Sequence, residues 1–238
     1  MSGPRSTPTG AWWWSCRTDE VPEGDGWLTG QEQTVLEGLE FPKRREDWLL
    51  GRWTAKQAVA AYLAMRGKGL PAEQIEIRAA PDGAPEAFGE DRPLSVSISI
   101  SHREGLGLCT VTAPDISPGC DVERIEPRSD AFIRDYLNHP EQAVLRAAGA
   151  RYRDLLANLY WSAKESALKV LREGLRQDPL QWAVVPRGVG EGDPGVWNRL
   201  TVEGKGGRAF QGWWQRRGDD VLTFLSDPAV PRPSPLKE

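Results

Sequence analysis

The stretches GCDVE at residues 119–123 and WSAKESALK at residues 161–169 decide the fold and the site of this chain. In the first stretch, apolar residues flank Asp121 and Glu123. Side chains alternate along a strand, so both carboxylates are expected on one face. In the second stretch, residues four apart are neighbours on a helix, which aligns Glu165 with Lys169. The two stretches together predict one divided site with three carboxylates and a lysine.

The acidic residues of these stretches suit a hard cation. Magnesium binds a few carboxylate oxygens and completes its shell with water and substrate phosphate. We therefore expect Mg²⁺ here, with Mn²⁺ as the alternative ion. The histidines and cysteines form no pair at zinc-ligand spacing, so zinc and disulfide interpretations have little support. These residues are His102, His139, Cys16, Cys109 and Cys120.

Composition excludes several classes of protein. The chain has 238 residues, 39% of them hydrophobic, which is enough for a buried core. Its net charge of −4 and pI of about 5.4 argue against non-specific binding of nucleic acid. No stretch approaches the ~18 apolar residues of a membrane span. We expect a cytoplasmic protein with reduced thiols and no membrane or nucleic-acid partner.

Apolar periodicity predicts an α+β fold with a small, mostly antiparallel sheet and a long helix in each half. The expected domains are an N-terminal subdomain at 1–115, a C-terminal subdomain with the metal site at 116–226, and a Pro-rich tail at 227–238. No convincing internal sequence repeat is visible. Helices are expected at 43–66, ending at Gly67, at 140–148, and at 152–173, ending at Gly174. Strands are expected at 75–77, 94–100, 107–112, 120–125, 181–185, 196–202, 209–215 and 221–226.

Eleven tryptophans are many for this length, and they include the run at 12–14 and the pair at 213–214. Packing of large rings in the core and at sheet edges is the favoured interpretation. Stacking of one ring on an adenine stays open.

GCDVE and WSAKESALK, preceded by Ser99-Ile100-Ser101-His102, resemble in order and spacing the three motifs of the 4'-phosphopantetheinyl transferases, in particular the longer Sfp-type class. The resemblance extends from about Arg44 to Leu175. It implies two pseudo-twofold-related subdomains with the active site in the cleft between them, in a chain that works as a monomer.

The resemblance also implies the reaction. Such an enzyme moves 4'-phosphopantetheine from coenzyme A to a serine hydroxyl of an acyl or peptidyl carrier protein and leaves adenosine 3',5'-bisphosphate. On the family pattern, Asp121, Glu123 and Glu165 hold Mg²⁺. Lys169 approaches the phosphates. Glu165 is the candidate base, directly or through a water, so the implied catalytic residues are Glu165, Lys169 and Asp121.

Other residues are expected to bind coenzyme A. The family match assigns phosphate contacts to Ser101 and His102. Lys164 is either a helper at the phosphates or the ion-pair partner of another residue that holds the helix. The basic cluster near residue 43 opposes the dipole of its own helix, which favours an anionic ligand such as the 3'-phosphate. Its candidate residues are Arg44, Arg45 and Arg52.

The chain departs from the family pattern at Gly83-Ala84-Pro85, where many relatives have a lysine that touches the nucleotide. Segment 31–39 is also acidic where relatives are often basic. These departures leave an alternative, a coenzyme A binding relative without transfer activity. A nucleic-acid binder using residues 43–56 fits the acidic pI poorly and does not explain the carboxylates.

The carrier is expected to be acidic around its serine, which requires a basic and apolar rim beside the cleft. Segment 124–136, with Arg128, Phe132, Ile133 and Arg134, is the hypothesis for that rim.

Overall fold

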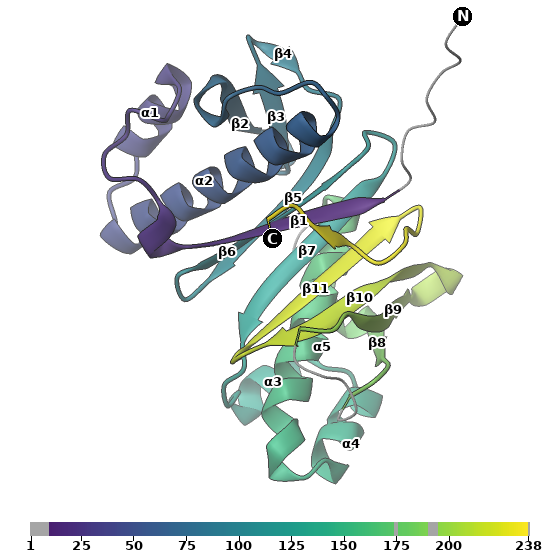
Figure 1. The fold of residues 1–238 in the computed structure, drawn as a ribbon. Coiled ribbons are helices and arrows are strands. Elements are labelled where there is room, and N and C mark those ends of the chain that lie inside the picture. The colour runs from purple at the N-terminus through teal and green to yellow at the C-terminus, as the bar shows by residue number, and fades with distance from the viewer. Residues whose placement is uncertain (1–9, 174–175, 190–194, 238) are drawn as a thin grey trace, which may run out of the picture.

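The computed structural model describes residues 10–173, 176–189 and 195–237, which form an α+β fold (Figure 1). The expected end of the long second-half helix at Gly174 lies outside the described residues. The elements of the first half are β1 (Ala11–Arg17), α1 (Gly30–Glu37), α2 (Pro42–Met65), β2 (Ile75–Ala79), β3 (Pro85–Gly89), β4 (Arg92–Pro93), β5 (Ser97–Arg103) and β6 (Leu106–Thr112).

The second half begins with the strand that contains GCDVE. Its elements are β7 (Ser117–Arg124), α3 (Asp130–Tyr136), α4 (His139–Ala147), α5 (Ala150–Leu171), β8 (Trp182–Pro186), β9 (Asn198–Gly204), β10 (Ala209–Arg217), β11 (Asp220–Asp227) and β12 (Ser234–Pro235). Short 3-10 helices lie at Thr18–Glu20, Ala72–Gln74, Pro179–Gln181 and Lys205–Gly207. The predicted long helices and core strands are confirmed to within a few residues, whereas β1, β3, β4, α3 and β12 were not predicted.

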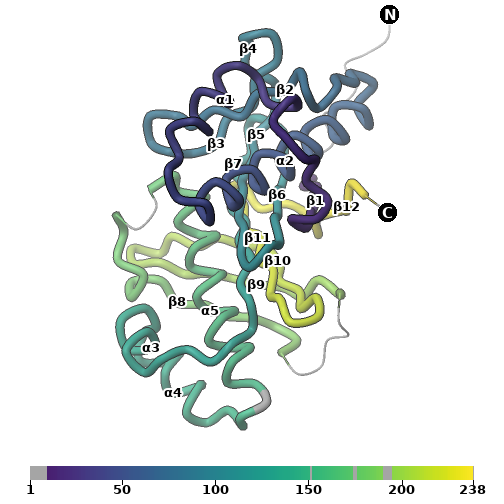
Figure 2. Tube along the Cα trace, turned by 90° about the vertical axis from the view of Figure 1, so that its left-hand side faces the viewer, coloured from purple at the N-terminus to yellow at the C-terminus, as the bar shows by residue number. Residues whose placement is uncertain are grey.

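The described residues form three sheets, with strand orders β12-β1-β6-β5, β2-β3-β4 and β7-β11-β10-β9-β8. Neighbouring strands are antiparallel except for β12, which pairs in parallel with β1. The segment expected as a Pro-rich tail therefore returns to the first half. Figure 2 places α1, α2 and β2–β4 at one end and α3 and α4 at the other, with β5, β6, β7 and β11 between them.

Each half has its own core, and a third apolar cluster joins the halves. Helix α2 packs its apolar stripe on β1, β5 and β6, while α5 packs on β7 and β11. The joining cluster includes Leu108 of β6, Val122 of β7 and Phe224 of β11, all fully or almost fully buried. Burial of apolar surface from both halves in one cluster couples their folding.

The two halves repeat the same structural unit. The segment WTAKQA at 53–58 in α2 corresponds to WSAKES at 161–166 in α5. In each half a short helix precedes the long one, and the first and last strands pair antiparallel: β1 with β6, and β7 with β11. The sequence similarity between the halves is short, and it lies where both long helices make the same buried contacts.

Those shared contacts centre on a buried lysine in each long helix. The Nζ of Lys56 lies 2.6 Å from Glu32 Oε2, and the Nζ of Lys164 lies 2.7 Å from Glu141 Oε2. Both lysine side chains are 0% exposed. Each glutamate also accepts a backbone N–H from a strand of its own half, at Ile77 or Val184. Each of these ion pairs thus ties a short helix, a long helix and a strand together.

The ring-packing interpretation of the tryptophan run is supported. Trp12 packs edge-on against Tyr62 of α2, with ring centroids 5.2 Å apart, and Trp13 packs against Trp197 at 5.9 Å. Both contacts tie β1 to elements far away in the sequence.

Candidate active site

Strand β7 holds the acidic pair close to helix α5 because Gly119 has no side chain. A Cβ added at Gly119 would lie 2.0 Å from the carbonyl oxygen of Ser166 and 2.9 Å from Val170. The glycine therefore permits direct contact between β7 and α5. Two residues later, Asp121 comes within reach of Lys169 on that helix.

Strand β5 crosses the free edge of β7 and satisfies its backbone with serine hydroxyls. Ser99 Oγ accepts the N–H of Cys120 at 3.0 Å, and Ser101 Oγ accepts the N–H of Val122 at 3.4 Å. The Ser101 hydroxyl also donates to Asp121 Oδ1 at 2.6 Å. These contacts fix the Asp121 carboxylate and leave no edge N–H of β7 unsatisfied at either position.

Lys169 is held against the same carboxylate. Its Nζ donates to Asp121 Oδ1 at 2.9 Å and to the carbonyl oxygen of Cys120 at 2.9 Å. Burial acts to lower the pKa of Lys169, but the attraction of Asp121 and Glu165 outweighs it and raises that pKa. Lys169 is therefore a charged, oriented ammonium group whose side chain keeps 28% exposure.

Glu165 lies one turn before Lys169 and is in a strongly perturbed environment. Burial, with repulsion from Asp121 and Glu123, raises the pKa of Glu165 to about 7, although Lys169 opposes the shift. Its Oε1 is buried and has no hydrogen-bond partner among the described residues, and the same holds for Asp121 Oδ2. Two unpaired carboxylate oxygens, close enough to repel each other, are chemically suited to a cation.

Glu123 is the most heavily paired of the three carboxylates. Its Oε2 lies 2.7 Å from the guanidinium of Arg128 and 3.6 Å from that of Arg103, while Oε1 accepts the indole N–H of Trp161 at 3.0 Å. Burial, with repulsion from Asp121, raises the pKa of Glu123, and the two arginines counteract part of that rise.

The carboxylates thus fit a cation in part. Within the described ranges, no group of three or more His, Cys, Asp or Glu side chains is arranged as a metal site. Asp121 and Glu165 each offer an unpaired oxygen, whereas Glu123 has its oxygens engaged by arginine and tryptophan.

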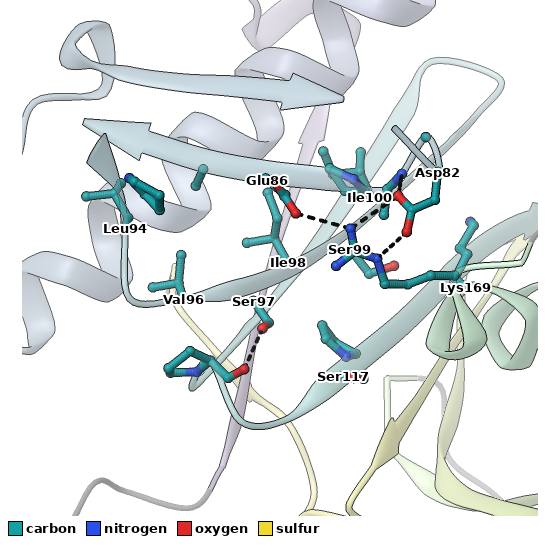
Figure 3. Close-up of a pocket in the computed structure, with 18 of the residues that line it drawn as sticks. Asp82, Glu86, Leu94, Val96, Ser97, Ile98, Ser99, Ile100, Ser117 and Lys169 are labelled. Carbon is teal, nitrogen blue, oxygen red and sulfur yellow. Dashed lines mark hydrogen bonds and ion pairs between the residues drawn. The ribbon is translucent and has the colours of Figure 1, made fainter. Parts of the chain in front are cut away.

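A pocket of about 570 Å³ opens beside Lys169, between β3, β5 and the end of α5 (Figure 3). Leu94, Val96 and Ile98 give it an apolar side, and Ser99 and Ser117 lie across from them. The Gly83-Ala84-Pro85 loop also lines it, as the family pattern implies for a nucleotide contact. None of its lining residues is a tryptophan, so the described structure gives no support to adenine stacking on one of these rings.

The structure separates His102 from Ser101. Side chains alternate along β5, so Ser101 faces β7 while His102 lies on the other face, beside Gly51 of α2. His102 is exposed overall, but partial burial of its ring against α2 lowers the pKa of its imidazole, with Lys169 and Lys43 acting in the same direction.

The arginines predicted for the 3'-phosphate lie along α2 and do not line the pocket. Arg45 donates to the carbonyl oxygens of Leu36 and Leu39 and so caps α1. Arg52 stacks over Trp48 at 4.8 Å and has a buried Nε without a partner among the described residues. Arg44 is exposed.

Lys164 lies in the interior rather than at the phosphates. Its Nζ pairs with Glu141 and donates to the carbonyl oxygen of Tyr136 at 2.9 Å. Of the two roles weighed for Lys164, the geometry agrees with the ion pair that holds the helix.

Sequence reasoning missed one basic residue of the pocket, Arg172, and its partners Asp82 and Glu86. Arg172 follows Lys169 by three residues, a helical spacing that could have indicated a shared face. Its partners are about ninety residues away in the sequence, so no local pattern identifies them.

The two arginines expected on the rim segment 124–136, Arg128 and Arg134, differ in how accessible they are. Arg128 is engaged by Glu123 and by Asn158, with an Nε–Oδ1 distance of 2.6 Å, and its side chain is only 13% exposed. Arg134 is 69% exposed on α3. Phe132 and Tyr136 of α3 pack against Trp161 of α5. Arg134 is therefore freer than Arg128 to meet a partner.

Comparison with known proteins agrees with these motifs. Residues 117–200 match the model of the 4'-phosphopantetheinyl transferase superfamily, which confirms the resemblance over that region. Holo-[acyl-carrier-protein] synthases from two strains of Streptococcus agalactiae are each 36% identical over 75 residues. That alignment covers 32% of this chain, and the chain spans 63% of the length of these curated relatives.

Solved structures of similar description were also found. A holo-(acyl-carrier-protein) synthase from Bacillus anthracis, in complex with CoA (3',5'-ADP), is 24% identical with a TM-score of 0.35, over 44% of this chain and 95% of the other. The Thermotoga maritima holo-[acyl-carrier-protein] synthase is 19% identical with a TM-score of 0.37, over 53% and 73%. In the described part of the chain, no helix has the length and apolar character needed to cross a membrane.

Proposed function

We propose that this chain, whose residues 117–200 match the 4'-phosphopantetheinyl transferase superfamily, transfers 4'-phosphopantetheine from coenzyme A to a carrier-protein serine. The observation that carries the proposal is the cluster of Asp121, Glu165 and Lys169, which lies inside the matched segment and whose Lys169 lines a pocket. A charged lysine beside acidic residues is suited to phosphoryl transfer, where catalysis depends on positioning and charge stabilisation. Assignment to the longer Sfp-type class is part of this proposal.

In the proposed reaction, the serine oxygen forms a bond to the phosphorus that bears the pantetheine arm. The bond from that phosphorus to the bridging oxygen breaks, and adenosine 3',5'-bisphosphate leaves. Glu165 accepts the serine proton, directly or through a water, from its buried position beside Asp121 and Lys169. Lys169, oriented by Asp121, stabilises the leaving phosphate.

Magnesium is the proposed cofactor, with Mn²⁺ as the alternative ion. Asp121 and Glu165 would hold it through their unpaired oxygens, and Glu123, whose oxygens are engaged by Arg128 and Trp161, would be the third ligand. A bound divalent cation supplies neutralisation of the pyrophosphate charge. Ser101 keeps Asp121 in place from β5.

The proposal extends to assembly and compartment. Asp121, Glu165, Lys169 and Ser101 all come from one chain, which supports a monomer. The three cysteines are free thiols and buried, as expected in a reducing cytoplasm. Neither nucleic acid nor a membrane is a proposed partner.

Mass spectrometry of unmodified carrier proteins tests the transfer. The carriers are incubated with this protein, coenzyme A and Mg²⁺, beside a Glu165→Ala variant. We expect a mass gain of one phosphopantetheine on at least one carrier, and none with the variant. Equal gain with both proteins would exclude Glu165 as the base.

A second candidate function is coenzyme A binding without transfer, which Ala84 favours because it cannot replace the nucleotide-contacting lysine of the family pattern. It predicts that calorimetry detects coenzyme A binding while no carrier gains mass. Loss of both signals would exclude both candidates.

Arg134 is the proposed carrier contact on the rim. Arg134→Glu should raise the KM for an acidic carrier about 5- to 10-fold through like-charge repulsion, with the KM for coenzyme A unchanged. Arg208→Glu changes an exposed residue outside the rim segment and serves as the control. An unchanged carrier KM in Arg134→Glu would remove α3 from the docking surface.

A further inference from the structure

The end of α5 has an arginine in a conformation that normally favours glycine. Arg172 takes φ 58° and ψ 27°, the left-handed region, as the C-cap of the helix. A residue with a Cβ is strained there relative to glycine. The Arg172 side chain is therefore present at a conformational cost, which suggests that it has a task of its own.

This conformation accompanies a bridge across the mouth of the pocket. Arg172 Nε lies 2.7 Å from Asp82 Oδ2, and its terminal nitrogen lies 3.2 Å from Asp82 Oδ1 and 3.1 Å from Glu86 Oε1. The dashed lines at Asp82 and Glu86 in Figure 3 are these contacts. One guanidinium thus ties the end of α5 to Asp82 in the loop between β2 and β3 and to Glu86 in β3.

The pocket has an unusual charge balance for a site that takes a polyanion. Its charged lining residues are Lys169, Arg172, Asp82 and Glu86, two of each sign. Lys169 is committed to Asp121 and a backbone carbonyl. Among the described residues, the Arg172 side chain is bound through exposed ion pairs at the mouth, with 44% of it accessible, and such pairs contribute little net free energy. Arg172 can therefore exchange these carboxylates for a phosphate at small cost.

We propose that Arg172 is a phosphate-binding residue of this pocket, held by Asp82 and Glu86 until a phosphate of coenzyme A displaces them. The inference depends on the proposed function, because it assigns coenzyme A to this pocket. Arg172 would supply the positive charge that Ala84 cannot supply. Ala84 lies on the loop that contains Asp82. A guanidinium is suited to this exchange because its fork matches carboxylate and phosphate oxygens alike.

Calorimetric titration with coenzyme A tests the proposal through changes of opposite sign. Arg172→Gly should raise the Kd about 10-fold or more, as expected for loss of a charge-assisted hydrogen bond. Because glycine is favoured at this φ, the variant should keep its thermal midpoint within a few degrees. Asp82→Asn combined with Glu86→Gln should lower the Kd about 3-fold or more, since it removes both the competing partners and the like charge.

If the bridge only holds α5 against the β2–β3 loop, the result should differ. Breaking the bridge from either side should then weaken coenzyme A binding equally. Arg172→Gly is therefore also made in the Asp82→Asn, Glu86→Gln background. A persisting loss of affinity there supports direct phosphate contact, whereas no loss overturns it, since Arg172 would then only screen the carboxylates. Arg208→Ala, which removes one exposed charge outside the pocket, should leave the Kd unchanged.

Two further arms complete the test. Dephospho-coenzyme A lacks the 3'-phosphate, so an equal loss with this ligand assigns Arg172 to the pyrophosphate, and a smaller loss assigns it to the 3'-phosphate. If the wild-type protein binds coenzyme A and Arg172→Gly binds it equally well, the inference fails while the proposed function stands. If the wild-type protein binds no coenzyme A, the proposed function itself fails.

Discussion

At the scale of single residues, the cations of the candidate site pair with Asp121 and Glu123 rather than with Glu165. Asp121 has Lys169 and Ser101, and Glu123 has Arg128 and Trp161. Glu165 has no hydrogen-bond partner at Oε1 among the described residues. Removal of a carboxylate from water disfavours its ionised form, and neighbouring carboxylates add to that effect. Glu165 is therefore ready to bind either a proton or a cation.

The raised pKa of Glu165 predicts a pH-dependent stability in the metal-free protein. Below pH 4.5 the group is protonated both folded and unfolded, so it contributes no difference. As the pH rises from 4.5 to about 7, the unfolded state ionises first and the folded state loses stability. Glu165→Gln removes this loss, so it should stabilise the protein at pH 8 by up to about 3 kcal/mol and have little effect at pH 4.

Urea unfolding at the two pH values in a chelator measures this difference. Glu203→Gln, at an exposed strand position, is the matched control and should behave like the wild type at both. The same Glu165→Gln protein should lose transfer activity by about 100-fold or more, as expected for a missing general base. Equal stability gains at pH 4 and pH 8 would contradict the assigned pKa.

At the scale of elements, the site depends on how closely β7 approaches α5. Serine hydroxyls from β5 accept backbone N–H groups at the edge of β7, and the backbone of α5 packs directly against Gly119. Gly119 permits the second contact. A sheet edge, a helix and a crossing strand thus meet at Asp121, and none of the three alone holds the carboxylate.

Gly119→Ala should therefore disturb both stability and function. The added methyl group would overlap the Ser166 carbonyl oxygen at 2.0 Å and force β7 away from α5. We expect a loss of about 3 kcal/mol or more in the free energy of unfolding, at the upper end for overpacking. Gly149→Ala, at the N-cap of the same helix with no atom within 4 Å of the added Cβ, is the control. Chemical denaturation of both variants measures the difference, and equal stabilities would show that the contact is not tight.

At the scale of the whole molecule, the chain is two copies of one unit, and the acidic site occurs in one of them. Gln57 and Ala61 of α2 occupy the positions of Glu165 and Lys169 in α5. Strand β1 has no acidic residue where β7 has two. The buried Lys56–Glu32 and Lys164–Glu141 pairs are retained in both copies. The first copy thus keeps the structural ion pair and lacks the acidic chemistry.

Lys56→Met and Lys164→Met should each destabilise the protein by about 3–5 kcal/mol, because either change leaves a buried glutamate without its cation. The apolar cluster that joins the halves should make each variant unfold in one transition. Scanning calorimetry checks both the midpoint and the number of transitions. Adding Glu32→Gln to the first variant, or Glu141→Gln to the second, should recover part of the loss. Two separate transitions would show that the halves fold independently.

The sequence by itself predicted the long helices at 43–66 and 152–173, which the structure has at Pro42–Met65 and Ala150–Leu171, together with the main strands and the acidic and lysine positions proposed for the site. It could do so because side-chain periodicity and short motifs are local properties, readable over one or two turns or strands. It also determined the family resemblance, which the family model confirms for residues 117–200.

Only the tertiary structure decided which of these groups meet. Lys164 is adjacent in sequence to Glu165, yet helical rotation sends it into the interior against Glu141. Arg172 meets Asp82 across about ninety residues, and β12 returns to β1 across most of the chain. Such contacts depend on how the elements pack. Packing brings together segments that are distant in the sequence, so no local sequence pattern reveals it.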